Sequence, residues 1–318
     1  MKIVAKVTRK IITGVRLIIQ NSVRVIAAFS WTRWWLNAIY LKLTPYQRSL
    51  FYQEFAKIFR NSYIRGSDGI WKVFFVNKKI LMPLTAENFY LEWDSAISIV
   101  GHDLEVKQTY ESLIGSSEKP ELFIDIGASY GTHSLLFLVN DIKTITFEPN
   151  TSCHNYFKKI CKLNNVTSIL EPVALGDRVG YVELSYPKHD TWLGSTNAEV
   201  INNLSLSHEL VTKKVKQKMI DNYFSKVSNN RTLIKIDTEG NELSVLRGAI
   251  ITLQENKPMI IFECFGDSGR AGIFDYFNSQ NYSIYYLPWS PTYKADSLTF
   301  DQFIVSSSTN FIAVPIST

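Results

Sequence analysis

Nine consecutive residues decide the fold class: Phe123-Ile124-Asp125-Ile126-Gly127-Ala128-Ser129-Tyr130-Gly131. An apolar run ends near an acid, and a turn with two glycines then opens a helical stretch at 132–139. A strand, a glycine turn and a helix in this order are typical of the first unit of a parallel α/β sheet. Gly127 and Gly131 allow a ligand to approach the backbone, and free N–H groups at a helix start attract a carboxylate or phosphate. The stretch therefore predicts a nucleotide-type pocket.

The same alternation of short apolar runs with amphipathic helical stretches continues to the end of the chain. It predicts a doubly wound, seven-stranded, mostly parallel Rossmann-like α/β sheet, preceded by a helical and small β extension. The expected strands lie near 121–127, 144–148, 166–175, 231–237, 258–264, 282–287 and 310–315. We expect three parts: a basic helical extension at 1–60, a small β unit with a helical lead-in at 61–118, and the sheet domain at 119–318. In the second part, strands at 71–76 and 79–84 flank an Asn77-Lys78 turn.

Acids follow the ends of the first three predicted strands. Glu148 ends Thr146-Phe147-Glu148-Pro149-Asn150, and Asp177 ends Ala174-Leu175-Gly176-Asp177. A carboxylate at the second strand end can accept hydrogen bonds from both hydroxyls of a ribose. Strand-end acids can also be solvated or cap the next helix. Together the three acids favour an adenosine-containing ligand at the carboxyl edge of the sheet.

The fourth and fifth strands also end in carboxylates. Lys235-Ile236-Asp237-Thr238-Glu239-Gly240 closes the fourth strand, and Glu263 closes the fifth. Asp237 and Glu263 on neighbouring strands can share a proton, act as a base, or hold a hard divalent cation such as Mg²⁺. The alternative is that Asp237 or Glu239 caps the helix that follows, because acids favour first turns.

The glycine turn discriminates between two cofactors. The dinucleotide fingerprint G-x-G-x-x-G requires three glycines, and only Gly127 and Gly131 occur here. The carboxylate of Asp125 would repel a pyrophosphate, whereas it would attract an ammonium group. The turn therefore favours S-adenosylmethionine over NAD.

These motifs in this order resemble the FkbM family of class I S-adenosylmethionine-dependent methyltransferases. The resemblance rests on D-x-G-A-x-x-G, F-E-P, A-L-G-D, K-I-D-T-E-G-x-E, P-x-I-x-F-E and a closing N-F-I-A-V-P, over residues 100–315. It implies O-methylation of a hydroxyl on a saccharide, glycolipid or related natural product. One departure is Ser129, where the family usually has Asn.

The resemblance also implies residue roles. Asp125, Gly127, Ala128 and Gly131 would hold the methionine end of the cofactor, Glu148 the ribose and Asp177 the adenine. Asp237 and Glu239 would face the acceptor. The strand ends themselves, apart from the resemblance, add Glu263 as a third candidate catalytic carboxylate. A metal ion, if one is used, would be bound by Asp237 and Glu263.

Composition and charge limit the partners. Residues 1–60 carry eleven Lys or Arg and one acid, a net charge of +10, whereas the rest of the chain carries −5. Bases interleaved with Trp31, Trp34 and Trp35 suit a helix lying on an anionic membrane, although they equally suit a helical cap on the main domain. No transmembrane helix, cleaved signal peptide or nucleic-acid partner is expected.

The remaining features concern location and acceptor. Three scattered cysteines indicate a reducing compartment, and five N-x-S/T sequons are interpreted as chance, so a cytoplasmic location, peripheral on a membrane face, is expected. The acceptor would be a small molecule or a lipid-linked saccharide. Trp192 could stack on a sugar and His189 could act as a base, with surface decoration as the alternative. The other functions weighed are an NAD-dependent Rossmann oxidoreductase and a non-catalytic, membrane-associated binding protein.

Overall fold

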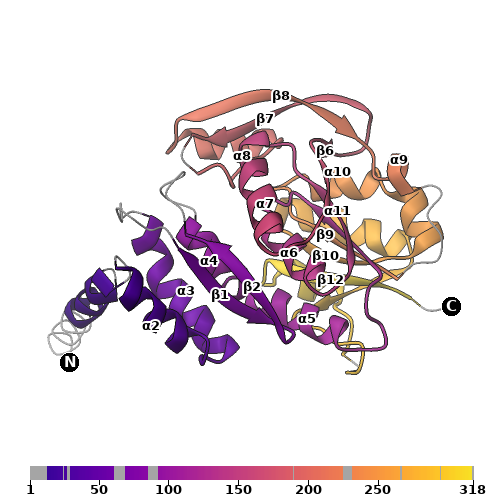
Figure 1. Ribbon diagram of the computed structural model, residues 1–318. Coiled ribbons are helices and arrows are strands. Elements are labelled where there is room, and N and C mark those ends of the chain that lie inside the picture. The colour runs from indigo at the N-terminus through magenta and orange to yellow at the C-terminus, as the bar shows by residue number, and fades with distance from the viewer. Residues whose placement is uncertain are drawn as a thin grey trace, which may run out of the picture. The chain divides into compact units, whose positions relative to one another are not determined.

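The computed structural model describes residues 13–23, 25–26, 29–60, 69–84, 92–188, 190–224, 231–265, 267–293 and 295–316 (Figure 1). The chain forms two compact units, Met1–Leu104 and Glu105–Thr318. The boundary between the units falls inside the segment 61–118 that was expected to form a single part. Each unit is described here by itself.

The first unit combines helices with one hairpin. Residues 13–23 are helical, followed by α2 (Ser30–Tyr40), α3 (Pro45–Arg60), β1 (Ile70–Phe75), β2 (Lys78–Pro83) and α4 (Glu92–Gly101). The turn between β1 and β2 consists of Val76 and Asn77, both at positive φ, so it lies one residue earlier than the predicted Asn77-Lys78 turn. Positive φ at both central residues is the geometry of a two-residue hairpin turn that matches strand twist.

The buried face of the hairpin carries large side chains. Trp71, Val73 and Phe75 alternate with exposed residues along β1, as expected for a strand with one face in the core. Tyr40 at the end of α2 packs on the Trp71 ring at a centroid distance of 5.1 Å. The hairpin and α2 therefore share one core.

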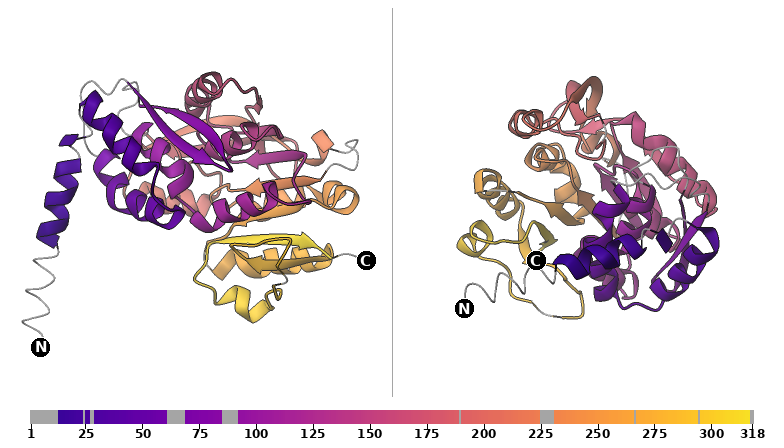
Figure 2. Two further views of the ribbon diagram at one scale, coloured as in Figure 1. Left: turned by 60° about the horizontal axis from the view of Figure 1, so that its bottom comes forward. Right: turned by 90° about the vertical axis from the view of Figure 1, so that its left-hand side faces the viewer.

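The second unit contains the predicted seven-stranded sheet. Its strand order is β11-β12-β10-β9-β3-β4-β5, and only β12 runs antiparallel to its neighbours. The strands are β3 (Leu122–Ile126), β4 (Lys143–Phe147), β5 (Ile169–Glu171), β9 (Thr232–Ile236), β10 (Met259–Glu263), β11 (Tyr282–Tyr286) and β12 (Asn310–Pro315). β3 and β9 are buried at every position, because helices cover both faces of the sheet (Figure 2). The fold class is therefore confirmed.

Helices connect the strands of this sheet. They are α5 (Leu104–Ile114), α6 (Thr132–Leu138), α7 (Thr151–Leu163), α8 (Ala198–Ser205), α9 (Asp221–Phe224), α10 (Glu242–Arg247), α11 (Asp267–Ser279) and α12 (Phe300–Ile304), with a π-helical turn at Thr252–Asn256. In the part of the chain that is described, no helix is both long and apolar enough to cross a bilayer.

One predicted strand is wrong in extent. The segment 166–175 is divided into β5 in the main sheet and β6 (Ala174–Leu175) in a second sheet, with Pro172 between them. Proline has no N–H to donate to a strand ladder, so continuous pairing ends there. The second sheet has the order β6-β8-β7. Its long antiparallel pair, β7 (Gly180–Pro187) and β8 (Leu210–Lys218), lies at the top of Figure 1.

Candidate active site at the carboxyl edge of the sheet

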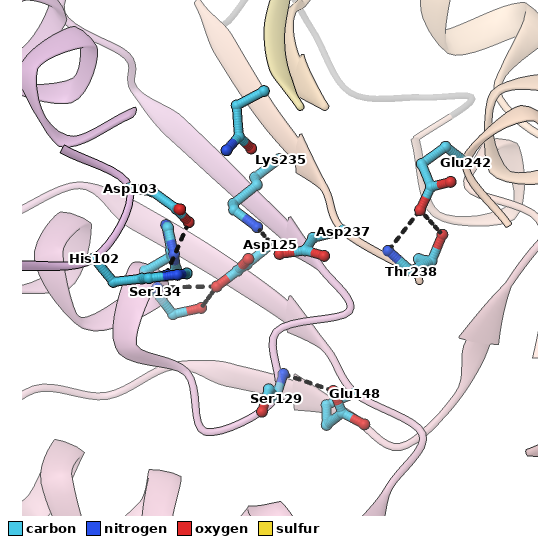
Figure 3. Close-up of polar contacts among 12 residues, drawn as sticks. His102, Asp103, Asp125, Ser129, Ser134, Glu148, Lys235, Asp237, Thr238 and Glu242 are labelled. Atoms are coloured by element: carbon cyan, nitrogen blue, oxygen red, sulfur yellow. Dashed lines mark hydrogen bonds and ion pairs between the residues drawn. The ribbon is translucent and has the colours of Figure 1, made fainter. Parts of the chain in front are cut away.

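Asp125 is a buried anchor for the glycine turn. Its side chain is 1% exposed, and its Oδ2 accepts hydrogen bonds from the N–H (2.9 Å) and hydroxyl (2.7 Å) of Ser134 in α6 (Figure 3). Burial raises the pKa of Asp125, while Lys235, its register partner on β9, opposes the rise. Asp125 therefore joins the strand end to the helix that follows it.

The glycines of this turn are required by the packing of the chain on itself. A Cβ on Gly127, which has φ +74°, would lie 1.8 Å from the carbonyl oxygen of Asp237. A Cβ on Gly131 would lie 2.1 Å from the Phe157 ring. The first two N–H groups of the turn, from Gly127 and Ala128, both donate to the Phe147 carbonyl. Close contact between the turn and the end of β9 therefore explains Gly127.

Glu148 lies directly after β4 and faces the glycine turn. Its two carboxylate oxygens accept one backbone N–H each, from Ser129 and from Asn150, both at 2.6 Å (Figure 3). Burial raises the pKa of Glu148 to about 7, opposed by these two hydrogen bonds. A carboxylate oxygen has two lone-pair positions, so each oxygen can accept a further hydroxyl.

Asp237, Glu239 and Glu263 form one group, here called the carboxylate cluster. One oxygen from each lies within 4.8 Å of the others. The Lys235 ammonium, 3% exposed, contacts Asp237 Oδ2 at 2.5 Å. Burial alone would lower the pKa of Lys235, but Asp237 and Asp125 outweigh burial and raise it. Lys235 is therefore a permanent cation beneath the cluster.

The two glutamates of the cluster hold protons more tightly than usual. Burial, reinforced by the Asp237 charge and a hydrogen bond to Asp237, raises the pKa of Glu263 to about 11. Burial and the Asp237 charge raise the pKa of Glu239 to about 8. Both glutamates therefore favour the protonated form more strongly than an ordinary carboxyl does.

The turn that carries Glu239 is strained, and hydrogen bonds to Glu242 hold it in place. Glu239 has φ +52°, a left-handed conformation that costs a non-glycine residue about 1–2 kcal/mol. Glu242 in α10 accepts hydrogen bonds from the Thr238 N–H and hydroxyl, both at 2.9 Å, and from the Gly240 N–H at 3.1 Å. Such strain persists where surrounding contacts enforce it, and it is frequent at functional sites.

A loop covers both strand ends. Residues 190–197, here called the strap, contact the second strand end through the Thr191 carbonyl, which accepts from Asn150 Nδ2 at 3.0 Å, and through a Tyr130–Thr191 hydroxyl contact. At its other end, Ser195 Oγ donates to the Glu239 carbonyl and Asn197 Nδ2 to the Gly240 carbonyl, both at 2.7 Å. The strap therefore bridges the Glu148 region and the carboxylate cluster, with a half-buried Trp192 between its two ends.

Most of the predicted site residues converge. The charges of Asp125 and Asp237 both raise the pKa of Glu148, so these three predicted acids lie within electrostatic reach of one another. Asp177 does not join them: it is exposed after β6, and its N–H donates to Ser244 Oγ in α10 at 3.2 Å. His189 lies outside the described residues.

Sequence reasoning missed three contributors. Lys235 carried a signal, because a lysine within an apolar strand must find a partner when buried. Glu242 is the last residue of the K-I-D-T-E-G-x-E motif, but the sequence did not indicate its hydrogen bonds to the turn. Thr191 carried no signal, because its contact with Tyr130 spans 61 positions of the chain.

The chemistry of the site fits S-adenosylmethionine. Asp125 and the carboxylate cluster act on one lysine, Lys235, and Glu148 lies within electrostatic reach of Asp125 and Asp237. This excess of carboxylates favours a ligand with ammonium and sulfonium charges. The same acids would repel the pyrophosphate of NAD, which disfavours the oxidoreductase alternative. Glu148 has the acceptor capacity that a ribose diol needs.

The chain has weak similarity to methyltransferases of known structure. Among solved structures, the chain is similar to a methyltransferase FkbM from Methylobacillus flagellatus (14% identity, 70% of this chain and 54% of that chain, TM-score 0.38). It is also similar to an S-adenosylmethionine-dependent methyltransferase from Agrobacterium tumefaciens (8% identity, 79% and 72%, TM-score 0.41). The chain thus spans about half of the length of the first of these proteins. No curated protein matches the chain.

The family assignment rests on sequence, because those structural similarities are too weak to carry it. The profile of the methyltransferase FkbM domain matches residues 125–284, which is half of the chain. The match begins at Asp125 and includes Glu148 and the whole carboxylate cluster. The chain therefore belongs to the FkbM methyltransferase family.

Proposed function

We propose that this protein transfers the methyl group of S-adenosylmethionine to a hydroxyl of a saccharide, glycolipid or related natural product. The observation that carries the proposal is the close approach of Gly127 to the backbone of Asp237. This approach puts the glycine turn, where the family binds its cofactor, directly beside a cluster of three carboxylates.

On this proposal, one set of side chains acts on the cofactor and a second set acts on the acceptor. Glu148 accepts the ribose hydroxyls, and Asp125 holds the glycine turn in place through Ser134. S-adenosylmethionine, when bound, supplies a methyl group on a positively charged sulfur. The excess of carboxylates over Lys235 stabilises that charge.

The carboxylate cluster handles the proton of the acceptor. A sugar hydroxyl is a poor nucleophile at neutral pH and needs a base as it reacts. Asp237 is occupied by Lys235 on one side and by the protonated Glu263 on the other. Glu239, whose pKa burial raises to about 8, is the member matched to accept a proton near neutral pH. The hydroxyl proton passes to Glu239 while the hydroxyl oxygen bonds to the methyl carbon, whose bond to sulfur breaks and leaves S-adenosylhomocysteine.

A divalent cation is the second way in which this cluster could activate a hydroxyl. Asp237 and Glu263 would be its ligands, with Glu239 within reach of both. Mg²⁺ prefers carboxylate oxygens and would displace the proton on Glu263. Dialysis against a chelator separates the two mechanisms, because a carboxylate base needs no metal.

We propose that the strap contacts the acceptor. It bridges the two strand ends, and Trp192 offers a flat apolar face of the kind that stacks on sugar rings. We propose that Trp192 contributes to acceptor choice.

Turnover with labelled S-adenosylmethionine and a panel of saccharide and glycolipid acceptors tests the proposal. Wild type should label a hydroxyl, while Glu239→Gln should bind S-adenosylhomocysteine as well as wild type and lose turnover. Glu183→Gln, a carboxylate change at an exposed position of β7, is the matched control and should retain activity. Full activity in Glu239→Gln would remove Glu239 as the base, and transfer to nitrogen or carbon only would refute the acceptor class.

A further inference from the structure

Helix α2 has its amphipathic pattern reversed. Its outward face carries large apolar side chains at helical spacing: Trp31 is 69% exposed, and Trp34, Trp35 and Ile39 are each 59% exposed. Its inward face carries Arg33 and Asn37, both buried. A surface helix normally buries its apolar residues and exposes its polar ones.

Hydrogen bonds and ring contacts to the β1–β2 hairpin and α3 fix which face of α2 points inward. Asn37 Nδ2 donates to the Lys72 carbonyl at 2.8 Å, and its Oδ1 accepts from the Lys72 N–H at 2.9 Å. Tyr40, in line with Asn37, packs against Trp71 and Phe51. These contacts fix the three tryptophans on the other face of α2.

The preceding helix also exposes large apolar side chains, and its ion pair with α3 is solvent-exposed. Within 13–23, Arg16 and Gln20 contact the Glu54 side chain in α3, at 2.5 and 3.4 Å. The large side chains Val15, Leu17, Ile18 and Ile19 are all more than half exposed. Two successive helices of the first unit therefore leave large apolar side chains in solvent.

Charge identifies the occupant of this surface. Residues 1–60 have a net charge of +10, so a second copy of the chain would bring two segments of strong like charge together. An anionic bilayer instead attracts the bases, accepts the aliphatic side chains and suits tryptophan, which is enriched at membrane interfaces. At 11 residues, α2 is too short to cross a bilayer, which takes about 20, so it would lie in the interface plane.

We infer that the outward face of α2, with Trp31, Trp34 and Trp35 at its centre, docks this protein on a lipid surface with anionic headgroups. This inference is independent of the proposed methyl transfer, because no residue of α2 is assigned to that reaction. Docking would place the enzyme beside acceptors that are anchored in lipid.

Co-sedimentation of the full chain with vesicles tests the inference. Phosphatidylcholine vesicles with phosphatidylglycerol should pellet the wild type at low salt, and vesicles without phosphatidylglycerol, or high salt, should reduce binding at least tenfold. The variant Trp31→Ala/Trp34→Ala/Trp35→Ala should also bind at least tenfold more weakly. Tyr293→Ala removes an aromatic side chain that is 73% exposed in the second unit, and it should bind like wild type.

Quenching of wild-type tryptophan fluorescence by brominated lipids gives a second measurement that needs no variant. It should be strong with anionic vesicles and absent with neutral ones at high salt. Wild type that stays in the supernatant at low salt, or a triple variant that pellets equally well, would overturn the inference. A wild-type dimer that the triple variant converts to monomer, without lipid binding by either, would identify the face as a self-association surface instead.

Discussion

Replacing Lys235 by methionine should destabilise the protein in a way that depends on pH. Methionine retains most of the volume of Lys235 but removes the cation that contacts Asp237 Oδ2 at 2.5 Å. Breaking a buried ion pair by removing one partner costs about 3–5 kcal/mol. The Asp237 side chain is 27% exposed and therefore partly solvated, so we expect the lower end of that range at pH 8.

At pH 5 the loss should be smaller, because the cluster can bind a proton in place of the lysine. An ordinary carboxyl titrates near pH 4, so protonating one costs about 1.4 kcal/mol at pH 5 and about 5.5 kcal/mol at pH 8. The pKa of Lys235 is raised, so its own stabilising effect is complete below its unfolded value of 10.5 and is constant across this range. The pKa values of Glu239 and Glu263 are also raised, so their contribution is complete below 4.5 and is lost as pH rises through the folded values.

Urea unfolding followed by circular dichroism at pH 5 and pH 8 measures both losses. We expect about 3 kcal/mol at pH 8 and at most about 1.4 kcal/mol at pH 5. Lys213→Met, a matched change at an exposed lysine in β8, should change stability by less than about 0.5 kcal/mol at either pH. Equal losses in Lys235→Met at the two pH values would refute the assignment of Lys235 as the counterion of the cluster.

Two further predictions concern turnover and the glycine turn. Wild-type turnover should rise with pH and level off above about pH 8, the raised pKa of Glu239, because only the ionised form accepts a proton. In a pH–rate series, Glu239→Gln should lose this dependence and roughly 10²–10⁴-fold in kcat. A Glu239→Gln profile that keeps the wild-type shape would assign the titration to another group. Gly127→Ala should lose more than about 2 kcal/mol of stability or fail to fold, because its Cβ would overlap the Asp237 carbonyl. In Gly180→Ala the added Cβ has no atom within 4 Å, so this control should be nearly neutral in thermal unfolding. A stable Gly127→Ala would contradict the close contact of the two strand ends.

The main sheet was predictable because its central strands are buried on both faces. Such strands read as short apolar runs, as at Leu122–Ile126 and Thr232–Ile236, and the glycine turn fixes where the first helix begins. The long antiparallel pair of β7 and β8 was not predicted. β8 carries four lysines, and its pairing with β7 joins residues up to 37 positions apart.

The site was predictable where the residue type alone carries the chemistry. Asp125, Glu148, Asp237 and Glu263 end adjacent strands, and parallel strands bring their carboxyl ends to one edge. Roles within the site depend on burial, which sequence does not show. Burial raises the pKa values of Glu263 and Glu239, whereas Asp237 contacts the Lys235 ammonium.

The most direct test of the account is calorimetric titration of the wild type and of Glu148→Gln with S-adenosylhomocysteine and with NAD. The account predicts micromolar binding of S-adenosylhomocysteine by wild type and none of NAD. It predicts a loss of about 1–3 kcal/mol in Glu148→Gln, roughly 5- to 150-fold, because a buried ribose hydroxyl then lacks its charged acceptor. Equal affinity in both proteins would remove Glu148 from the cofactor site, and binding of NAD without S-adenosylhomocysteine would contradict the methyltransferase account itself.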